Sequence, residues 1–164
     1  MRIFVVSILL GCSLMSVSLD AAEPGTRELV QELGVALAWR LGPETIEETC
    51  RSFDPDGVVV RQQALKAWLE KNDAMIKEVD NRVADVVPAL YPKAPSDAAV
   101  KAVRANIKTL LLESGFAEQS DDGKRDICKA EANPQSPRWN NNGMPHVQQA
   151  LAVLYDWKVK QGTQ

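Results

Sequence analysis

Hydrophobic residues recur at helical spacing along nearly the whole chain, and no segment shows the sustained alternation typical of a strand. Leucines stand at every fourth position over residues 29–41, which predicts a first helix capped by Thr26 and ended by Gly42. Pro43 suits the first position of a second helix, a short one over residues 43–53.

The longest run of helical spacing covers residues 58–87. Its inward positions are three or four residues apart: Val60, Ala64, Trp68, Asn72, Met75 or Ile76, Val79, Val83 and Val86. A straight helix of this length would reach about 45 Å, which is more than a domain of this size needs, so we expect a bend near Asn72. Pro88, Pro92 and Pro95 then predict an extended connector.

Three further helical segments follow the connector. Ser96 is placed to cap the first of them, Ser120 or Asp121 opens a short one, and Pro145 starts the last. Residues 133–144 are irregular. The sequence therefore predicts an all-α fold, a small irregular helical bundle of five or six helices.

The N-terminus has the pattern of a secretory signal. Arg2 precedes an apolar run over residues 3–14, which is too short to span a bilayer, and small residues follow up to Ala22. We expect residues 1–22 to be a signal peptide and residues 23–164 a single helical domain, located in the periplasm or secreted. Cys12 also lies in a lipoprotein-like sequence, so a lipid anchor there is the alternative.

Cys50 and Cys128 remain after this segment. An even pair in an exported protein predicts a disulfide, and its long loop is worth about 4.5 kcal/mol in the chain-entropy model. The alternative is a catalytic thiol acting with His146.

Composition excludes some functions. Of the 164 residues, 45% are hydrophobic and 25% charged, and the net charge is −3. This balance is ordinary for one globular domain and argues against binding to nucleic acid or to an anionic membrane.

Catalytic and metal-binding motifs are missing from the sequence. His146 is the single histidine, which excludes a multi-histidine metal site. Asp54, Asp56 and Gly57 match part of a calcium loop, but Gln63 stands where the loop needs glutamate. We expect a turn there, with its aspartates capping the next helix. We expect no cofactor, no metal and no catalytic residue.

The acidic side chains before and within this turn form a cluster: Glu44, Glu47, Glu48, Asp54 and Asp56. A hydrolase would need two of these carboxylates across a cleft. The alternative, which we favour, is a solvated helix start, where carboxylates stabilise the positive end of the helix dipole.

A polar stretch over residues 136–143 places a tryptophan beside an arginine, two residue types common in interface hot spots. We therefore predict that a partner binds Arg138, Trp139, Asn140 and Asn141. The alternative is that Trp139 packs into the core and holds the loop in place.

Asn72 interrupts the apolar face of the long helix. A buried amide needs hydrogen-bond partners. Asn72 therefore either binds the backbone of a loop, such as the proline connector, or lines a groove for a partner.

These observations predict a non-catalytic protein-binding module of the bacterial cell envelope. One form would be an inhibitor or immunity-type protein that acts on a secreted enzyme. The expected partner is a protein in the envelope or the secreted space. A periplasmic carrier of a small apolar ligand is the alternative, and an enzyme that uses His146 with a carboxylate is a third possibility.

Overall fold

The computed structural model describes residues 24–140 and 143–162. The expected signal peptide, the lipid-anchor candidate Cys12 and the candidate Asn141 lie outside these residues. The described part is all α-helical, as predicted. Its elements are α1 (Pro24–Phe53), the short 3₁₀ helix η2 (Pro55–Gly57), α2 (Val58–Lys71), α3 (Asp73–Leu90), α4 (Ser96–Glu113), α5 (Asp121–Glu131) and α6 (Met144–Gly162).

The first helix was predicted to end at Gly42, but in the structure it continues through Pro43 to Phe53. A proline inside a helix removes a backbone hydrogen bond and costs about 3 kcal/mol or more. Gly42 and Pro43 are both buried, and the two halves of α1 pack against different hydrophobic clusters. This packing offsets the cost. Beside the proline, the hydroxyl of Thr45 donates to the carbonyl of Leu41 at 2.8 Å.

The long helical segment is divided at Asn72 into α2 and α3, so the expected bend is confirmed. α3 extends to Leu90 and contains Pro88. The proline connector is therefore shorter than predicted, because it starts only at Tyr91.

Helix starts were predicted less well than helix faces. α1 begins at Pro24, so Thr26 lies inside the helix and does not cap it. Ser120 caps α5 as expected, because its hydroxyl accepts a hydrogen bond from the backbone N–H of Gly123.

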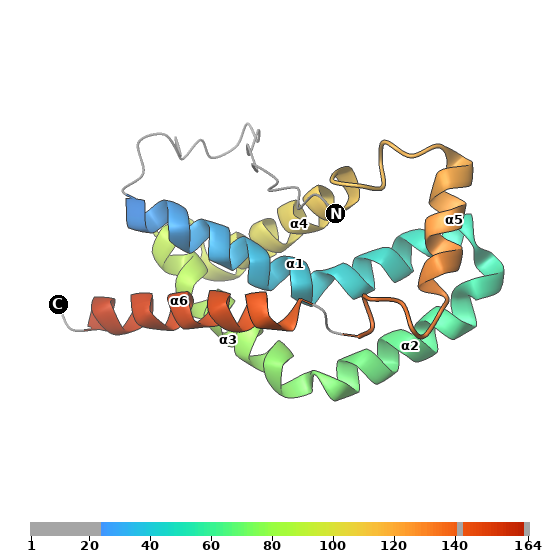
Figure 1. The fold of residues 1–164 in the computed structure, drawn as a ribbon. Coiled ribbons are helices and arrows are strands. Elements are labelled where there is room, and N and C mark those ends of the chain that lie inside the picture. The colour runs from blue at the N-terminus through green and yellow to red at the C-terminus, as the bar shows by residue number, and fades with distance from the viewer. Residues whose placement is uncertain (1–23, 141–142, 163–164) are drawn as a thin grey trace.

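The N-terminal half of α1 occupies the centre of the main core. Figure 1 shows α6 running beside it in the opposite direction, and α3 and α4 also pack against α1. The buried residues of this core are Leu29, Leu33, Ala36, Leu37, Leu41, Val79, Val83, Val86, Val87, Ala99, Val147, Ala150, Leu151 and Leu154. Most of the predicted inward positions of these helices are therefore confirmed.

The C-terminal half of α1 carries a second, smaller cluster. Cys50 and Cys128 form the predicted disulfide and join α1 to α5, with Ile46 and Phe116 buried beside them. A third cluster brings together Trp68, Ile76 and Trp139. Among the described residues, no helix combines the length and the apolarity needed to cross a membrane.

Candidate functional site

A buried arginine lies against the disulfide, and the sequence reasoning missed it. Arg61 has 0% of its surface exposed. Its Nη1 donates to the carboxylate of Asp54 and to the carbonyl of Cys128. Its Nη2 donates to the carbonyls of Cys50 and Asp54, at 3.2 and 2.6 Å. Arg61 thus holds α1, α2 and α5 together at the point where the disulfide joins two of them.

This arrangement corrects two predictions. Val60 was assigned to the inward face of its helix, but it is 39% exposed and Arg61 takes the inward place. Asp54 does not cap a helix with its side chain, since its carboxylate pairs with Arg61. The glycine at position 57 is needed here, because a Cβ on Gly57 would overlap both members of that ion pair.

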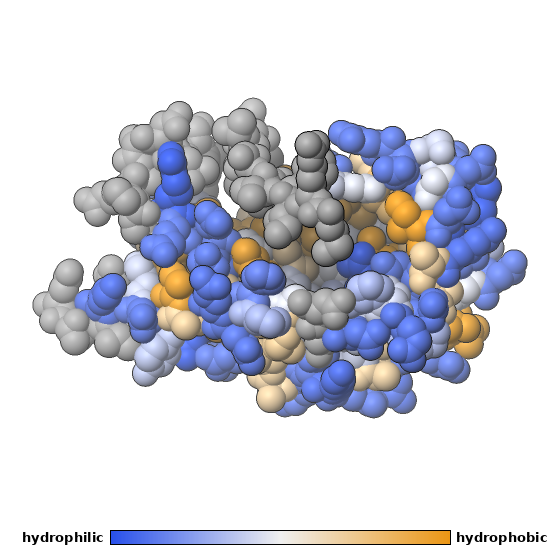
Figure 2. Space-filling model, viewed as in Figure 1, coloured by the Kyte–Doolittle hydropathy of each residue, from blue (hydrophilic) through white to orange (hydrophobic). Residues whose placement is uncertain are grey.

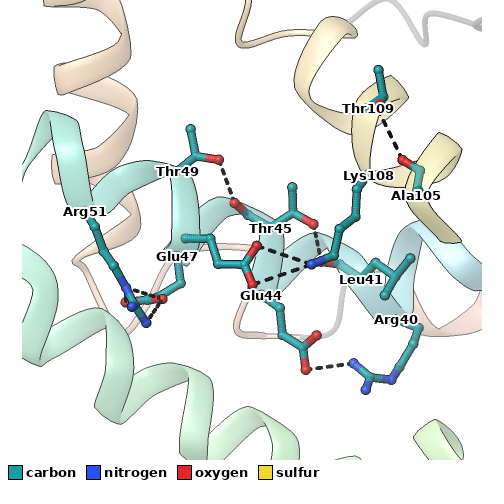
Figure 3. A network of polar contacts seen from close by, with 11 residues as sticks. Arg40, Leu41, Glu44, Thr45, Glu47, Thr49, Arg51, Ala105, Lys108 and Thr109 are labelled. Carbon is teal, nitrogen blue, oxygen red and sulfur yellow. Dashed lines mark hydrogen bonds and ion pairs between the residues drawn. The ribbon is translucent and has the colours of Figure 1, made fainter. Parts of the chain in front are cut away.

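The acidic cluster is largely neutralised by bases. Glu44 pairs with Arg40, Glu47 with Arg51, and Glu48 with Lys108 of α4; Figure 3 shows the first two pairs and Lys108. The three glutamates lie inside α1. They do not mark the start of a helix, so the expectation of a solvated helix start is wrong. A cleft with two unpaired carboxylates is therefore not formed by them.

Glu47 is an unexpected member of this cluster because it is buried. Its carboxylate accepts hydrogen bonds from Nε and Nη2 of Arg51. The hydrogen bond, and next the negative charge of Glu47, raise the pKa of Arg51 above its ordinary value. The charge of the exposed Arg51 therefore neutralises the buried carboxylate of Glu47.

The candidate loop is anchored by the tryptophan that was expected to meet a partner. Trp139 is only 6% exposed, and its Nε1 donates to the carbonyl of Glu131 at 3.0 Å. Asn140 is exposed, and its amide donates to the carbonyls of Gln135 and Ser136 in the same loop. The described part of the loop therefore has no exposed aromatic side chain. Trp139 packs into the core instead, which was the alternative.

Asn72 is buried at the junction of α2 and α3, and its Nδ2 donates to the carbonyl of Trp68 at 2.8 Å. This bond ends α2. The partner-binding role of Asn72 stays a prediction. His146 is exposed in the first turn of α6, and it makes no ion pair with any described carboxylate.

Two hollows open on the surface, and Arg138 lines both. The larger, which we name the α1–α4–α5 hollow, has a volume of about 350 Å³. Its lining residues are Gly42, Ile46, Leu111, Ser114, Gly115, Phe116, Ile127 and Arg138. Figure 2 shows hydrophobic residues inside a hollow next to α5, with hydrophilic residues around it. The smaller hollow, about 160 Å³, has Trp39, Trp68 and two prolines in its wall.

The α1–α4–α5 hollow could not be found from sequence, because its walls come from four separate segments. Only Arg138 was singled out beforehand. Among the described residues, no group of three or more potential metal ligands comes together.

Comparison with known proteins adds no functional assignment. No protein-family model matches the chain, and no curated protein or solved structure matches it either.

Proposed function

We propose that this chain is an exported, non-catalytic protein-binding module of the bacterial cell envelope, and that its partner binds in the α1–α4–α5 hollow. The observation that carries the proposal is the hollow itself: an apolar floor of Ile46, Leu111 and Ile127 with one cationic side chain, Arg138. Protein interfaces have this composition, an apolar centre with a polar rim in which arginine is enriched.

The shape of the hollow favours a protein over a small ligand. Small-molecule sites occupy about 300–1,000 Å³ and bury most of the ligand. The volume of the hollow, about 350 Å³, falls within this range, but the hollow is partly open to solvent and would leave part of a small ligand exposed. A few side chains of a partner would fill it, while the rest of the partner would cover the rim.

The disulfide beside the hollow supports a role outside the cytoplasm. Disulfides persist in oxidising compartments and stabilise small exported domains. Ile46 and Phe116 pack against the Cys50–Cys128 bridge and also line the hollow. An inhibitor or immunity-type protein would benefit from a binding surface held rigid in this way, because rigidity lowers the entropic cost of association.

A carrier of a small apolar ligand is the second candidate. The volume of the hollow is the observation that favours it. Native mass spectrometry of the purified chain would show a bound ligand if this candidate is right.

Affinity capture tests the proposal with one blocking variant. Gly115 lines the hollow, and a Cβ there meets no described atom within 4 Å, so Gly115→Phe adds a bulky side chain at the lining of the hollow without a clash at the Cβ. The chain beginning at Glu23 and its Gly115→Phe variant are used as baits for envelope and secreted extracts. We expect one enriched protein that the variant no longer captures.

The matched control is Gly34→Phe. Gly34 also has open space around its Cβ position, but it lies on α1 outside the residues that line the hollow. This variant should capture the same protein as the unmodified chain. Equal capture by Gly115→Phe would contradict the location of the site, and the absence of any enriched protein would contradict the function.

A further inference from the structure

The wall of the α1–α4–α5 hollow contains Arg138, whose side chain forms an ion pair but no hydrogen bond with the described residues. Nε of Arg138 lies 3.1 Å from Oε1 of Glu131, and the side chain is 30% exposed. The two Nη groups make no hydrogen bond with any described residue. They are therefore available to an acceptor that enters the hollow.

The guanidinium of Arg138 lies beside α1. A Cβ on Gly42 would stand 3.5 Å from Nη1 of Arg138, so the guanidinium lies directly against the helix at this point. Glu131 forms an ion pair with its Nε. The guanidinium therefore lies between Glu131 and α1, and its two Nη groups form the planar donor pair that a carboxylate binds best.

We propose that the hollow takes the C-terminal residue of the partner, with its apolar side chain on Ile46, Leu111 and Ile127 and its terminal carboxylate on the Nη groups of Arg138. This inference rests on the proposed protein-binding function. A C-terminal residue carries its carboxylate and its side chain on the same Cα. It therefore presents a charge and an apolar group together, and the lining of the hollow likewise combines Arg138 with apolar side chains.

Other occupants fit less well. A fatty acid has the same two features, but a long hydrocarbon chain would extend beyond a hollow of about 350 Å³ into water. An acidic residue within a partner chain would hold its carboxylate on a flexible side chain, and ordering that side chain on binding costs free energy. The open side of the hollow leaves space for the residues that precede a chain terminus.

The test uses the tripeptide acetyl-Ala-Ala-Leu with a free carboxylate, its C-terminal amide, and octanoate. Binding is followed by NMR through the methyl groups of Ile46 and Ile127 in the chain beginning at Glu23. We expect the free acid to shift both methyl signals and the amide to bind about tenfold more weakly, because a charge-assisted hydrogen bond is lost. Octanoate should bind more weakly than the acid.

Two variants locate the effect. Arg138→Gln should bind the acid and the amide equally, whereas Arg138→Lys, which keeps the charge but not the planar donor pair, should retain part of the preference. Gly115→Phe should abolish the shifts and Gly34→Phe should leave them unchanged. An unchanged backbone NMR spectrum shows that each variant is folded.

Equal binding of acid and amide by the unmodified chain would overturn the inference, and so would methyl shifts produced by octanoate alone. The proposed function fails separately, through the capture experiment. If the Gly115→Phe variant loses a partner but the tripeptide does not bind, the hollow binds protein by some feature other than a chain terminus.

Discussion

Nη1 of Arg61 donates to the carbonyl of Cys128 at 3.2 Å, although 67 positions separate the two residues. The same cysteine is bonded covalently to Cys50, whose carbonyl also accepts from Arg61. Arg61 of α2 and the disulfide between α1 and α5 therefore hold the same two backbone segments, at Cys50 and at Cys128.

Replacing this buried arginine should destabilise the fold strongly. Arg61→Met leaves the carboxylate of Asp54 without its buried partner and takes one of two donors from the carbonyls of Cys50 and Cys128. Breaking a buried pair in this way costs about 3–5 kcal/mol. Urea unfolding measures the loss. Arg125→Met on α5 is the control, because its ion pair with Asp122 is exposed and worth less than about 1 kcal/mol. Similar losses in the two variants would show that Arg61 is not a structural centre.

Removing the disulfide should weaken the fold through the same elements. The Cys50→Ala/Cys128→Ala variant should lose about 2–5 kcal/mol of unfolding free energy. In the Arg61→Met background the further loss should be smaller by about 0.5–3 kcal/mol, because the disulfide holds the carbonyls that Arg61 binds. Strictly additive losses in this double-mutant cycle would contradict the coupling.

Gly57→Ala adds only one methyl group but should clearly lower the stability of the fold. The added Cβ would overlap Asp54 and Arg61, so the ion pair must shift, at a cost of about 1–3 kcal/mol. Gly115→Ala is the matched control, since its Cβ meets open space and the change should stay below about 1 kcal/mol. Thermal unfolding of the two variants gives the comparison. Equal midpoints would mean that the ion pair adapts without cost.

Trp139 should behave as a core residue rather than as a binding residue. Trp139→Ala should lose about 3–5 kcal/mol of stability, because the ring is buried with Trp68 and Ile76. Trp139→Phe keeps most of the ring and loses the hydrogen bond to Glu131, at a cost of about 1–2 kcal/mol. The folded Trp139→Phe variant should capture the partner normally. Loss of capture without unfolding would restore the loop as the binding site.

Local patterns predicted most helix faces, and they failed where tertiary contacts outweighed local preference. The Gly42–Pro43 pair normally ends a helix, but here each half of α1 is held by its own cluster. The break at Asn72 was predicted from the length of the segment, because a straight helix of about 45 Å is longer than a domain of this size needs, and the structure has the junction of α2 and α3 there.

The site was harder to predict, because arginine is rarely fully buried. Val60 fitted the apolar spacing and was assigned to the inward face, so its neighbour Arg61, which takes that place, was not considered. One signal was present: an aspartate–proline–aspartate–glycine turn just after Cys50, with an arginine four residues beyond the glycine. Only the packed structure shows that the carbonyls of both cysteines meet that arginine.

The pairing of α1 with α6 affects the order in which the chain can fold. Leu37 of α1 and Leu154 of α6 are buried in the same core, so the first described helix is covered by the last. A chain that emerges from the ribosome with its N-terminus first exposes α1 long before α6 arrives. The apolar face of α1 that α6 covers therefore stays open to solvent until α6 has been synthesised, and these contacts between distant segments slow folding.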